Sequence, residues 1–495
     1  MRRLLLTASI LAATAPVSAD DWLQFGYDAA HSGNNTAESM LGPENVGSLV
    51  LHYAVPVTDG TPFDGAPVYA SAVATPWGPR DVIYAMSTAG TLYAIDAADG
   101  SVIWSQAVPG NLPTAASPAI DKGAGFVYSY GPDGNAHKYR LGDGVETTTG
   151  GWPQRVTLSS WDKVASSLTI GHGNAGDFLY VVTASLWDGG EYHGHVTTID
   201  LDTGSQNVFN VMCSNLPIHF VDNGIPGTND CSDARGGIWA RGGVTFDASI
   251  NRVFVVSGNG VFDGNAGGHN WGDSIIELSP RGTGYNGLPL DSYTPSNYQI
   301  LEDEDIDLGP NSVALIPTPS GYAVRHLGAQ LGKDFILRFV DLENLNGTYA
   351  PGATGGELLT VPNIGGGYPA QATVWVDPQD ARSTWLYIDG AAYQVTFDAP
   401  LPDPQYRWHG DGGSGRCAPV IANRVLYELC SVGLAAYDPR TGATLWTAVA
   451  GYGNSHWQSP IVVDGSVFVI DSLGRLSKFG LPLPDDIFSD GFDEG

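Results

Sequence analysis

Hydrophobic and polar residues alternate in short runs along most of the chain, most clearly between residues 82 and 104. The alternation has a period of two residues, which is typical of strands buried on one face. The turns between the runs carry Gly and Asp, which tolerate left-handed backbone angles. The stretch predicts strands at 82–86 and 91–96 and a third strand that ends at Trp104. Three short strands bury little alone, so the unit needs copies of itself.

The chain supplies these copies. Hairpins are predicted to start 40 to 75 residues apart, at eight places: near Val82, Phe126, Phe178, Val253, Tyr322, Trp385, Val425 and Val467. A recurrence of this length predicts a β-propeller. Three copies, at 94–104, 198–209 and 436–446, share a strand, an Asp, a turn ending in Gly and an outer strand. The Trp of that outer strand, or Phe209 in its place, is expected to pack between neighbouring blades.

The two ends of the chain are predicted to meet in one blade. The last hairpin, at 466–480, lacks an outer strand, whereas residues 44–57 form a strand without a neighbouring hairpin. We expect 44–57 to complete the last blade, with Tyr53 near the Trp position, because ring closure removes an exposed sheet edge. The prediction is therefore an all-β, eight-bladed propeller. Seven blades remain the alternative if one long segment is an insertion.

Composition agrees with a single repeat domain. The 495 residues include 65 Gly and 32 Pro but only 15% charged residues, and no linker-like run divides them. Residues 1–19 resemble a secretory signal, with Arg2 and Arg3 before an apolar run and a small-residue cleavage site at 17–19. The propeller is assigned to 20–480 and an acidic tail to 481–495. We expect a protein of the periplasm or the extracellular space, with no membrane span.

The net charge and the cysteines indicate which binding partners and which compartment suit the chain. The formal net charge of -30 argues against nucleic acid and against anionic membrane surfaces. We expect a monomer that binds a small-molecule or protein ligand. Four cysteines form two local pairs, Cys213 with Cys231 and Cys417 with Cys430. In an oxidising compartment each pair would close a short loop as a disulfide, worth about 3 kcal/mol in the chain-entropy model.

These details resemble the quinoprotein-dehydrogenase-like propellers, whose members bind pyrroloquinoline quinone (PQQ) on the axis of eight blades. The opening WLQFGYDAAHSGNN and the strand NVGSLVLHYAVPV are similar to the entry segment of that family. The Asp-x-x-Thr-Gly-x-x-x-Trp turns resemble its blade-locking repeats. The resemblance of the fold covers nearly all of 21–480, whereas the resemblance of the site is patchier.

In the enzymes of this family a Glu, an Asn and an Asp surround a calcium ion beside the quinone. The segment 189–204 is similar to the one that bears the Glu, and implies Glu191. SGNG at 257–260 implies Asn259. DIDLG at 305–309 implies Asp307 as the catalytic Asp, with Asp305 as its neighbour. The segment 328–347 implies Lys333 as the cation that touches the quinone.

The chemistry implied by the resemblance needs such a set. Calcium prefers carboxylate and amide oxygens and would act as a Lewis acid. Asp307 would take the substrate proton as general base, and Lys333 would stabilise charge on the reduced cofactor. Each residue also has an ordinary interpretation, because Glu191 and Asn259 lie in Gly-rich turns and Asp307 follows an acidic run. Lys333 could simply pair with a nearby carboxylate.

Several features depart from the enzymes. The chain has no adjacent cysteine pair to cover a quinone and no Cys-x-x-Cys-His for an attached haem. Arg241 stands where the family has a Trp floor, six residues before Asp247. Trp239 lies two residues earlier and reaches that place only after a local shift.

Three other patterns are weaker. Asp263, Asn265 and Asp273 resemble a calcium loop without its usual spacing. His193 and His195 share one side of a predicted strand, where a metal is less common than ordinary packing. GGG at 365–367 follows no strand-helix signal for phosphate.

Two functions therefore remain. The first is a PQQ- and calcium-dependent dehydrogenase of an alcohol, sugar or polyol. The second is a non-catalytic propeller that serves as a scaffold or binding protein, like the assembly-factor members of this fold. The fold cannot decide between them. The enzyme requires its four side chains to meet at one mouth of the axial channel, whereas the scaffold permits a filled channel.

Overall fold

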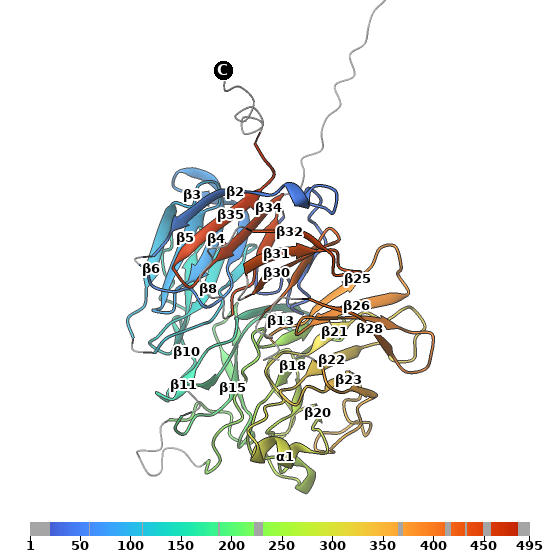
Figure 1. The fold of residues 1–495 in the computed structure, drawn as a ribbon. Helices are drawn as coiled ribbons and strands as arrows, with labels where there is room; N and C mark the ends of the chain where they lie inside the picture. The colour runs from blue at the N-terminus through green and yellow to red at the C-terminus, as the bar shows by residue number, and fades with distance from the viewer. Residues whose placement is uncertain are drawn as a thin grey trace, which may run out of the picture.

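Eight antiparallel sheets follow one another along the chain and form the blades of a β-propeller, as predicted. In the computed structural model the blades succeed one another in chain order (Figure 1). The innermost strands of most neighbouring blades contact one another around the axis. The structure describes residues 20–58, 60–110, 112–186, 189–221, 231–364, 370–410, 417–430, 433–448 and 457–483. The predicted signal segment, the end of the acidic tail and GGG at 365–367 lie outside these ranges.

Each blade is an antiparallel sheet with its first strand at the axis and its last strand at the rim. In this order, blades 1 and 2 contain β3 (Val68–Thr75), β4 (Gly78–Met86), β5 (Thr91–Asp96), β6 (Val102–Ala107), β7 (Ala119–Asp121), β8 (Phe126–Tyr130), β9 (Asn135–Arg140) and β10 (Gln154–Arg155). Blades 3 and 4 contain β12 (Thr169–Gly173), β13 (Gly176–Val182), β15 (His195–Asp200), β16 (Gln206–Asn210), β17 (Thr245–Asp247), β18 (Arg252–Val256), β19 (Ile275–Leu278) and β20 (Asp291–Tyr293).

The second half of the ring repeats the arrangement. Blades 5 and 6 contain β21 (Ala314–Ile316), β22 (Leu327–Leu331), β23 (Leu337–Asp341), β24 (Leu359–Val361), β25 (Thr373–Val376), β26 (Ser383–Ile388), β27 (Ala391–Thr396) and β28 (Asp403–His409). Blades 7 and 8 contain β29 (Val420–Ala422), β30 (Val425–Cys430), β31 (Gly433–Tyr437), β32 (Thr444–Thr447), β33 (Ile461–Val463), β34 (Ser466–Ile470), β35 (Arg475–Gly480) and β2 (Val50–Pro56).

Few elements lie outside this plan. They are β1 (Asn34–Asn35), which runs parallel to β29, the paired strands β11 (Asp162–Lys163) and β14 (Ala184–Ser185), the helix α1 (Tyr298–Asp303), and 3-10 turns at Val46–Ser48 and Gly264–Ala266. None of the described helices is long and apolar enough to cross a membrane.

The predicted ring closure is confirmed. The N-terminal strand β2 pairs antiparallel with β35 and forms the outer edge of blade 8, so the first and last strands lie side by side (Figure 1). Tyr53 on β2 donates its hydroxyl to the carbonyl of Ala97 in blade 1, at 3.0 Å. Trp104 in turn donates its indole N–H to the carbonyl of Leu141 in blade 2, at 2.8 Å. Tyr53 therefore takes the role of a blade-locking Trp at the closure.

Three boundaries were predicted wrongly. The strand expected at 44–57 covers only Val50–Pro56, because Val46–Ser48 forms a 3-10 turn before it. Trp104 lies in the middle of β6 rather than at its end. The hairpin expected near Tyr322 begins at Leu327, and Tyr322 instead donates its hydroxyl to the carbonyl of Pro400, at 3.0 Å. The alternation after Tyr322 imitates a strand, but the apolar core of blade 5 is supplied by the next residues, Leu327, Ala329 and Leu331.

The Gly of the repeat turn is required by the Trp of the preceding blade. A Cβ on Gly144 would lie 2.6 Å from the ring of Trp104, and a Cβ on Gly442 would lie 2.7 Å from the ring of Trp408. Both glycines also have positive φ, +66° and +70°, which L side chains rarely adopt. The turn Gly is thus fixed by backbone angle and by ring contact together.

We expect Gly144→Ala to lower the free energy of unfolding by about 2–4 kcal/mol, through left-handed strain and through overpacking against Trp104. Gly150→Ala is the matched control, because Gly150 has φ +64° and nothing within 4 Å of an added Cβ. The control should cost only the strain, about 1–2 kcal/mol. Urea denaturation of both variants measures the difference. Equal losses would show that the Trp contact contributes nothing.

The N-terminal segment 22–35 runs around the axis inside the ring. It forms hydrogen bonds with the second residue of the innermost strand in seven of the eight blades, all but blade 5, among the described residues. Those second residues are Tyr69, Ile120, Ile170, Phe246, Val374, Ile421 and Val462. One short segment therefore ties together the innermost strands of almost the whole propeller.

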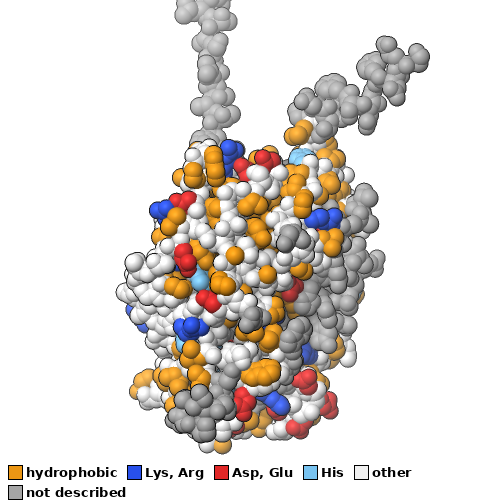
Figure 2. Space-filling model, turned by 90° about the vertical axis from the view of Figure 1, so that its left-hand side faces the viewer, with side chains coloured by type: hydrophobic (Ala, Val, Ile, Leu, Met, Phe, Trp, Pro, Cys, Tyr) orange, Lys and Arg blue, Asp and Glu red, His pale blue; other side chains and the backbone are white. Residues whose placement is uncertain are grey.

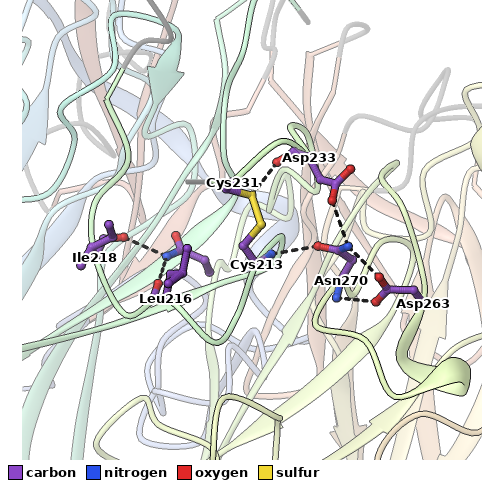
Figure 3. The surroundings of a disulfide bond; sticks show 8 residues. Cys213, Leu216, Ile218, Cys231, Asp233, Asp263 and Asn270 are labelled. Atoms are coloured by element: carbon purple, nitrogen blue, oxygen red, sulfur yellow. Dashed lines mark hydrogen bonds between the residues drawn. A yellow bond between two sulfur atoms is a disulfide. The ribbon is translucent and has the colours of Figure 1, made fainter. Parts of the chain in front are cut away.

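Both predicted disulfides are present, Cys213–Cys231 and Cys417–Cys430, and no described cysteine is free. Figure 3 shows the surroundings of the first. The backbone N–H of Cys213 donates to the side-chain oxygen of Asn270 at 2.9 Å, and Asn270 donates to the Asp263 carboxylate from its backbone and its side chain, each at 2.8 Å. Asp263 therefore orders the loop beside the disulfide.

Candidate functional site

All predicted site residues lie in loops on one face of the ring. Within each blade the innermost strand leaves this face, the second strand returns to it, and the next loop lies there as well. Loops that enter an innermost strand and loops between second and third strands therefore share what we call the site face. These loops carry the whole predicted set: Glu191, Trp239, Arg241, Asn259, Asp307 and Lys333.

Three of the predicted residues are in direct contact. The backbone N–H of Asn259 donates to Oδ1 of Asp307 at 2.8 Å. The ammonium of Lys333 pairs with Oδ2 of Asp307, and its backbone N–H donates to the Asp307 carbonyl at 3.0 Å. Asp307 and Asn259 are both buried. The loops of blades 4 and 5 thus bring together an amide, a carboxylate and an ammonium.

Trp239 lies beside this group. A Cβ on Gly258 would stand 2.1 Å from Oδ1 of Asp307 and 2.9 Å from Cδ1 of Trp239, so only Gly permits this approach. The indole N–H of Trp239 is buried and has no hydrogen-bond partner among the described residues. The ring meets Tyr192 edge-on, with 6.0 Å between centroids. Trp239 is therefore next to the Asp307 group and holds an unused donor.

Two further carboxylates, Asp273 and Glu302, belong to the same neighbourhood. Asp273 Oδ1 accepts the backbone N–H of Leu308 at 2.9 Å. Burial is the main reason that the pKa of Asp273 is raised well above its usual range; that hydrogen bond and Lys333 oppose the shift, and the charges of Asp307 and Glu302 add to it. Glu302 lies on α1, and its Oε1 accepts a hydrogen bond from Arg235 at 2.9 Å.

Three buried oxygens in these loops have no hydrogen-bond partner within the described part of the chain: Asn259 Oδ1, Asp273 Oδ2 and Glu302 Oε2. Amide and carboxylate oxygens are ligands that calcium prefers, and buried oxygens without partners are costly. However, three Asp, Glu, His or Cys side chains of the described residues place ligand atoms within 4.8 Å of one another at one position, formed by Cys417, Glu428 and Cys430. The two cysteines there are joined in a disulfide. The residues thus suit a cation, but the carboxylates are not gathered around one point.

Sequence reasoning does not assign Asp273 and Glu302 to this group. The sequence pattern groups Asp273 with Asp263 and Asn265 in a possible calcium loop, but Asp263 binds Asn270 and Asn265 is exposed. Glu302 begins the acidic run that precedes Asp307. The sequence did not reveal that Glu302 lies on the short helix α1, which brings it near Asp307 and Asp273.

Glu191 is exposed, and no described hydrogen bond or ion pair joins its carboxylate to Asn259 or Asp307.

The ring nitrogens of His195 are both occupied: Nδ1 lies 2.9 Å from the His193 carbonyl and Nε2 lies 2.9 Å from the Val156 carbonyl. Burial lowers the pKa of His195. His195 is therefore a core histidine, as the commoner interpretation expects.

Arg241 lies at the axis. Its guanidinium donates to the carbonyls of Asp64 at 3.2 Å, Ala115 at 3.0 Å and Ala165, and stands 5.1 Å from the ring centroid of Trp457. All five residues stand four residues before the innermost strand of their blades, which are blades 4, 1, 2, 3 and 8. Burial lowers the pKa of Arg241 to about 10, so it stays charged at neutral pH. A guanidinium thus joins the loops of several blades at the axis.

Part of the chain matches a family model. The model is described as outer membrane protein assembly factor BamB and matches residues 70–207, the region of blades 1 to 3. No curated protein matches the chain significantly.

Three solved structures share the fold over the whole ring. The chain is similar to a quinohemoprotein alcohol dehydrogenase from Pseudomonas putida (15% identity, TM-score 0.64, covering 94% of this chain and 82% of that one). It is also similar to a quinohemoprotein alcohol dehydrogenase from Comamonas testosteroni (16% identity, TM-score 0.63, covering 93% of this chain and 80% of that one). A europium-containing methanol dehydrogenase is similar as well (13% identity, TM-score 0.64, covering 93% of this chain and 98% of that one). The chain is therefore a PQQ-type, eight-bladed β-propeller in its fold.

Proposed function

We propose that this chain is an exported quinoprotein that binds PQQ and a divalent cation on the site face and oxidises an alcohol, sugar or polyol. The observation that carries the proposal is the contact of the buried Asn259 and Asp307 with the half-buried Lys333. The partnerless oxygens of Asn259 and Asp273 in the described loops beside it support a cation. The two disulfides support a location outside the cytoplasm.

Each residue of the group has a distinct part in this proposal. Asp307 would accept the proton of the substrate hydroxyl at its carboxylate. The Asn259 backbone N–H holds Oδ1 of that carboxylate, and Lys333 holds Oδ2, so its orientation is fixed before a substrate arrives. Trp239 would exclude water beside it. PQQ, when bound, would supply the hydride acceptor.

A non-catalytic binding propeller is the second candidate, and two observations favour it. Arg241 already spans the axis with three backbone carbonyls as partners. Glu191, the implied third calcium ligand, is exposed. In this candidate the site face would hold a small-molecule or protein ligand without chemistry.

A titration separates the candidates. Purified mature protein is titrated with PQQ in excess calcium, and again with a calcium chelator, following quinone absorbance and melting temperature. The quinoprotein is expected to bind PQQ tightly only with calcium, and to melt at a higher temperature when loaded. No binding at high PQQ concentration would refute it and leave the binding propeller.

A further inference from the structure

Lys163 is the one lysine that has no partner in the described part of the chain. All five lysines lie in the described residues. Lys122 pairs with Asp21, Lys333 pairs with Asp307, Lys138 stands over the ring of Phe126, and Lys478 donates to the carbonyl of Ala97. The side chain of the half-buried Lys163 has no hydrogen bond, ion pair or ring contact in the described structure.

The position of Lys163 places it near the axis on the site face. It lies in β11, in the loop that enters the innermost strand of blade 3, two residues before Ala165, whose carbonyl binds Arg241. The charges of Asp64 and Arg241 both act on its ammonium. Loss of solvent is the main cause that lowers its pKa; Arg241 adds to this and Asp64 opposes it.

The charges around this point do not balance. Arg241 and Lys163 are two cations removed from water, and Asp64 is the carboxylate that acts on both. The N–H groups of Arg241 that donate are occupied by backbone carbonyls, which carry no net charge. A cation that is partly removed from water and has no hydrogen-bonded anionic partner is costly, so such a lysine is seldom kept for packing alone.

We infer that Lys163 and Arg241 form an anion site at the axis, in which Lys163 binds a carboxylate of the ligand directly and Arg241 supplies a fixed positive floor. The Nη1 and Nη2 groups of Arg241 already donate to backbone carbonyls, and its buried Nε–H is the donor that has no partner among the described residues. Arg241 can therefore add one hydrogen bond to the ligand, and the main direct contact is assigned to Lys163. The guanidinium is fixed by the backbone carbonyls of three blades and by the ring of Trp457, which makes the floor rigid.

The ligand is therefore a small carboxylate-bearing anion. Its identity as PQQ, whose rings carry carboxylates, rests on the proposed function. The anion site itself does not rest on it, because it follows from the two cations and their surroundings. Lys163 is then a cofactor-binding residue that the sequence did not indicate.

The test combines protection of Lys163 with binding by variants. Reductive methylation of the full-length mature protein, followed by peptide mass spectrometry, reports the reactivity of each lysine with and without PQQ plus calcium, and with citrate as a second probe. Lys163→Met removes the charge at similar volume, and Lys163→Arg restores it. Lys138→Met is the matched control, because Lys138 also has a pKa lowered by burial but lies over aromatic rings in blade 2.

We expect PQQ to slow methylation of Lys163 at least about tenfold, and Lys163→Met to weaken PQQ binding about 10- to 100-fold, as for loss of one charged hydrogen bond. Lys163→Arg should recover most of the affinity, and Lys138→Met should leave it unchanged. Unliganded Lys163→Met should melt no lower than the parent protein, since the lost ammonium has no described partner to leave behind.

The outcomes separate the two proposals. If PQQ binds the parent and Lys163→Met equally and protects no lysine at the axis, the anion site is refuted while the quinoprotein stands. If PQQ does not bind but citrate protects Lys163, the anion site stands and the quinoprotein is refuted. If neither anion changes the methylation of Lys163, the anion site is refuted.

Discussion

Replacement of His31 by alanine should lower the free energy of unfolding by about 4 kcal/mol. The imidazole is buried at the centre of the segment that links the blades, with Nδ1 2.7 Å from the Phe25 carbonyl and Nε2 3.1 Å from the Thr169 hydroxyl. Burial lowers the pKa of His31, and Nε2 also lies 2.8 Å from the Val244 carbonyl, so polar groups of the fold surround both ring nitrogens. The substitution would leave a cavity and buried polar groups without partners.

Guanidinium denaturation measures this loss, and His52→Ala is the control. His52 lies at the rim and makes one hydrogen bond among the described residues, to the Leu481 carbonyl at 3.0 Å, so its removal should cost less than about 1 kcal/mol. Hydrogen exchange should also rise at the amides of Phe246, Val374 and Ile421, which donate to the N-terminal segment. A variant as stable as the parent would contradict the idea that His31 holds this segment in place.

The sequence predicted the ring and its closure because both depend on repeated local patterns. Eight hairpins and an unpaired strand at 44–57 were enough to place β2 beside β35. The path of 22–35 could not be predicted in the same way. Its hydrogen bonds join mostly backbone atoms to the second residue of each innermost strand, and backbone contacts of this kind leave no pattern in the side chains.

The site was predictable only as far as individual residues resembled a family pattern. Asn259, Asp307 and Lys333 were named in that way and are in contact. Asp273 was assigned to another loop because it follows Asp263 and Asn265 closely in the sequence, whereas in the structure its Oδ1 accepts the backbone N–H of Leu308, 35 residues further along the chain. The role of Arg241 depends on equivalent positions in several blades, which one sequence does not display until the strands are known.

The face of the molecule drawn in Figure 2 adds little to the choice of function. On the face drawn in Figure 2, charged side chains of both signs are scattered in small groups among apolar and neutral ones. A scaffold that binds a protein partner is expected to present a larger apolar patch. The residues at the axis and Asp307 are therefore the ones whose substitution can distinguish a quinoprotein from a binding propeller.

Asp307→Asn should reduce PQQ-dependent dehydrogenase turnover about 10²- to 10⁴-fold, the usual contribution of a general base. The amide retains an oxygen that can accept the Asn259 N–H, so the loop should keep its shape, and PQQ should still bind in the absorbance titration. Lys333 loses its ion-pair partner, so a fall of the melting temperature by a few degrees is expected in the same variant.

Asp305→Asn is the control for this prediction. Asp305 belongs to the same acidic run but is exposed, and at its φ of +57° an Asn is tolerated as well as an Asp. Its turnover should equal that of the parent protein. If both variants lost turnover equally, the acidic run would be acting through its overall charge and Asp307 would not be the base. If Asp307→Asn bound PQQ and kept full turnover, the base would have to be another carboxylate of the group. Asp273 would then be the residue to replace next, because it is buried nearby and one of its oxygens lacks a described partner.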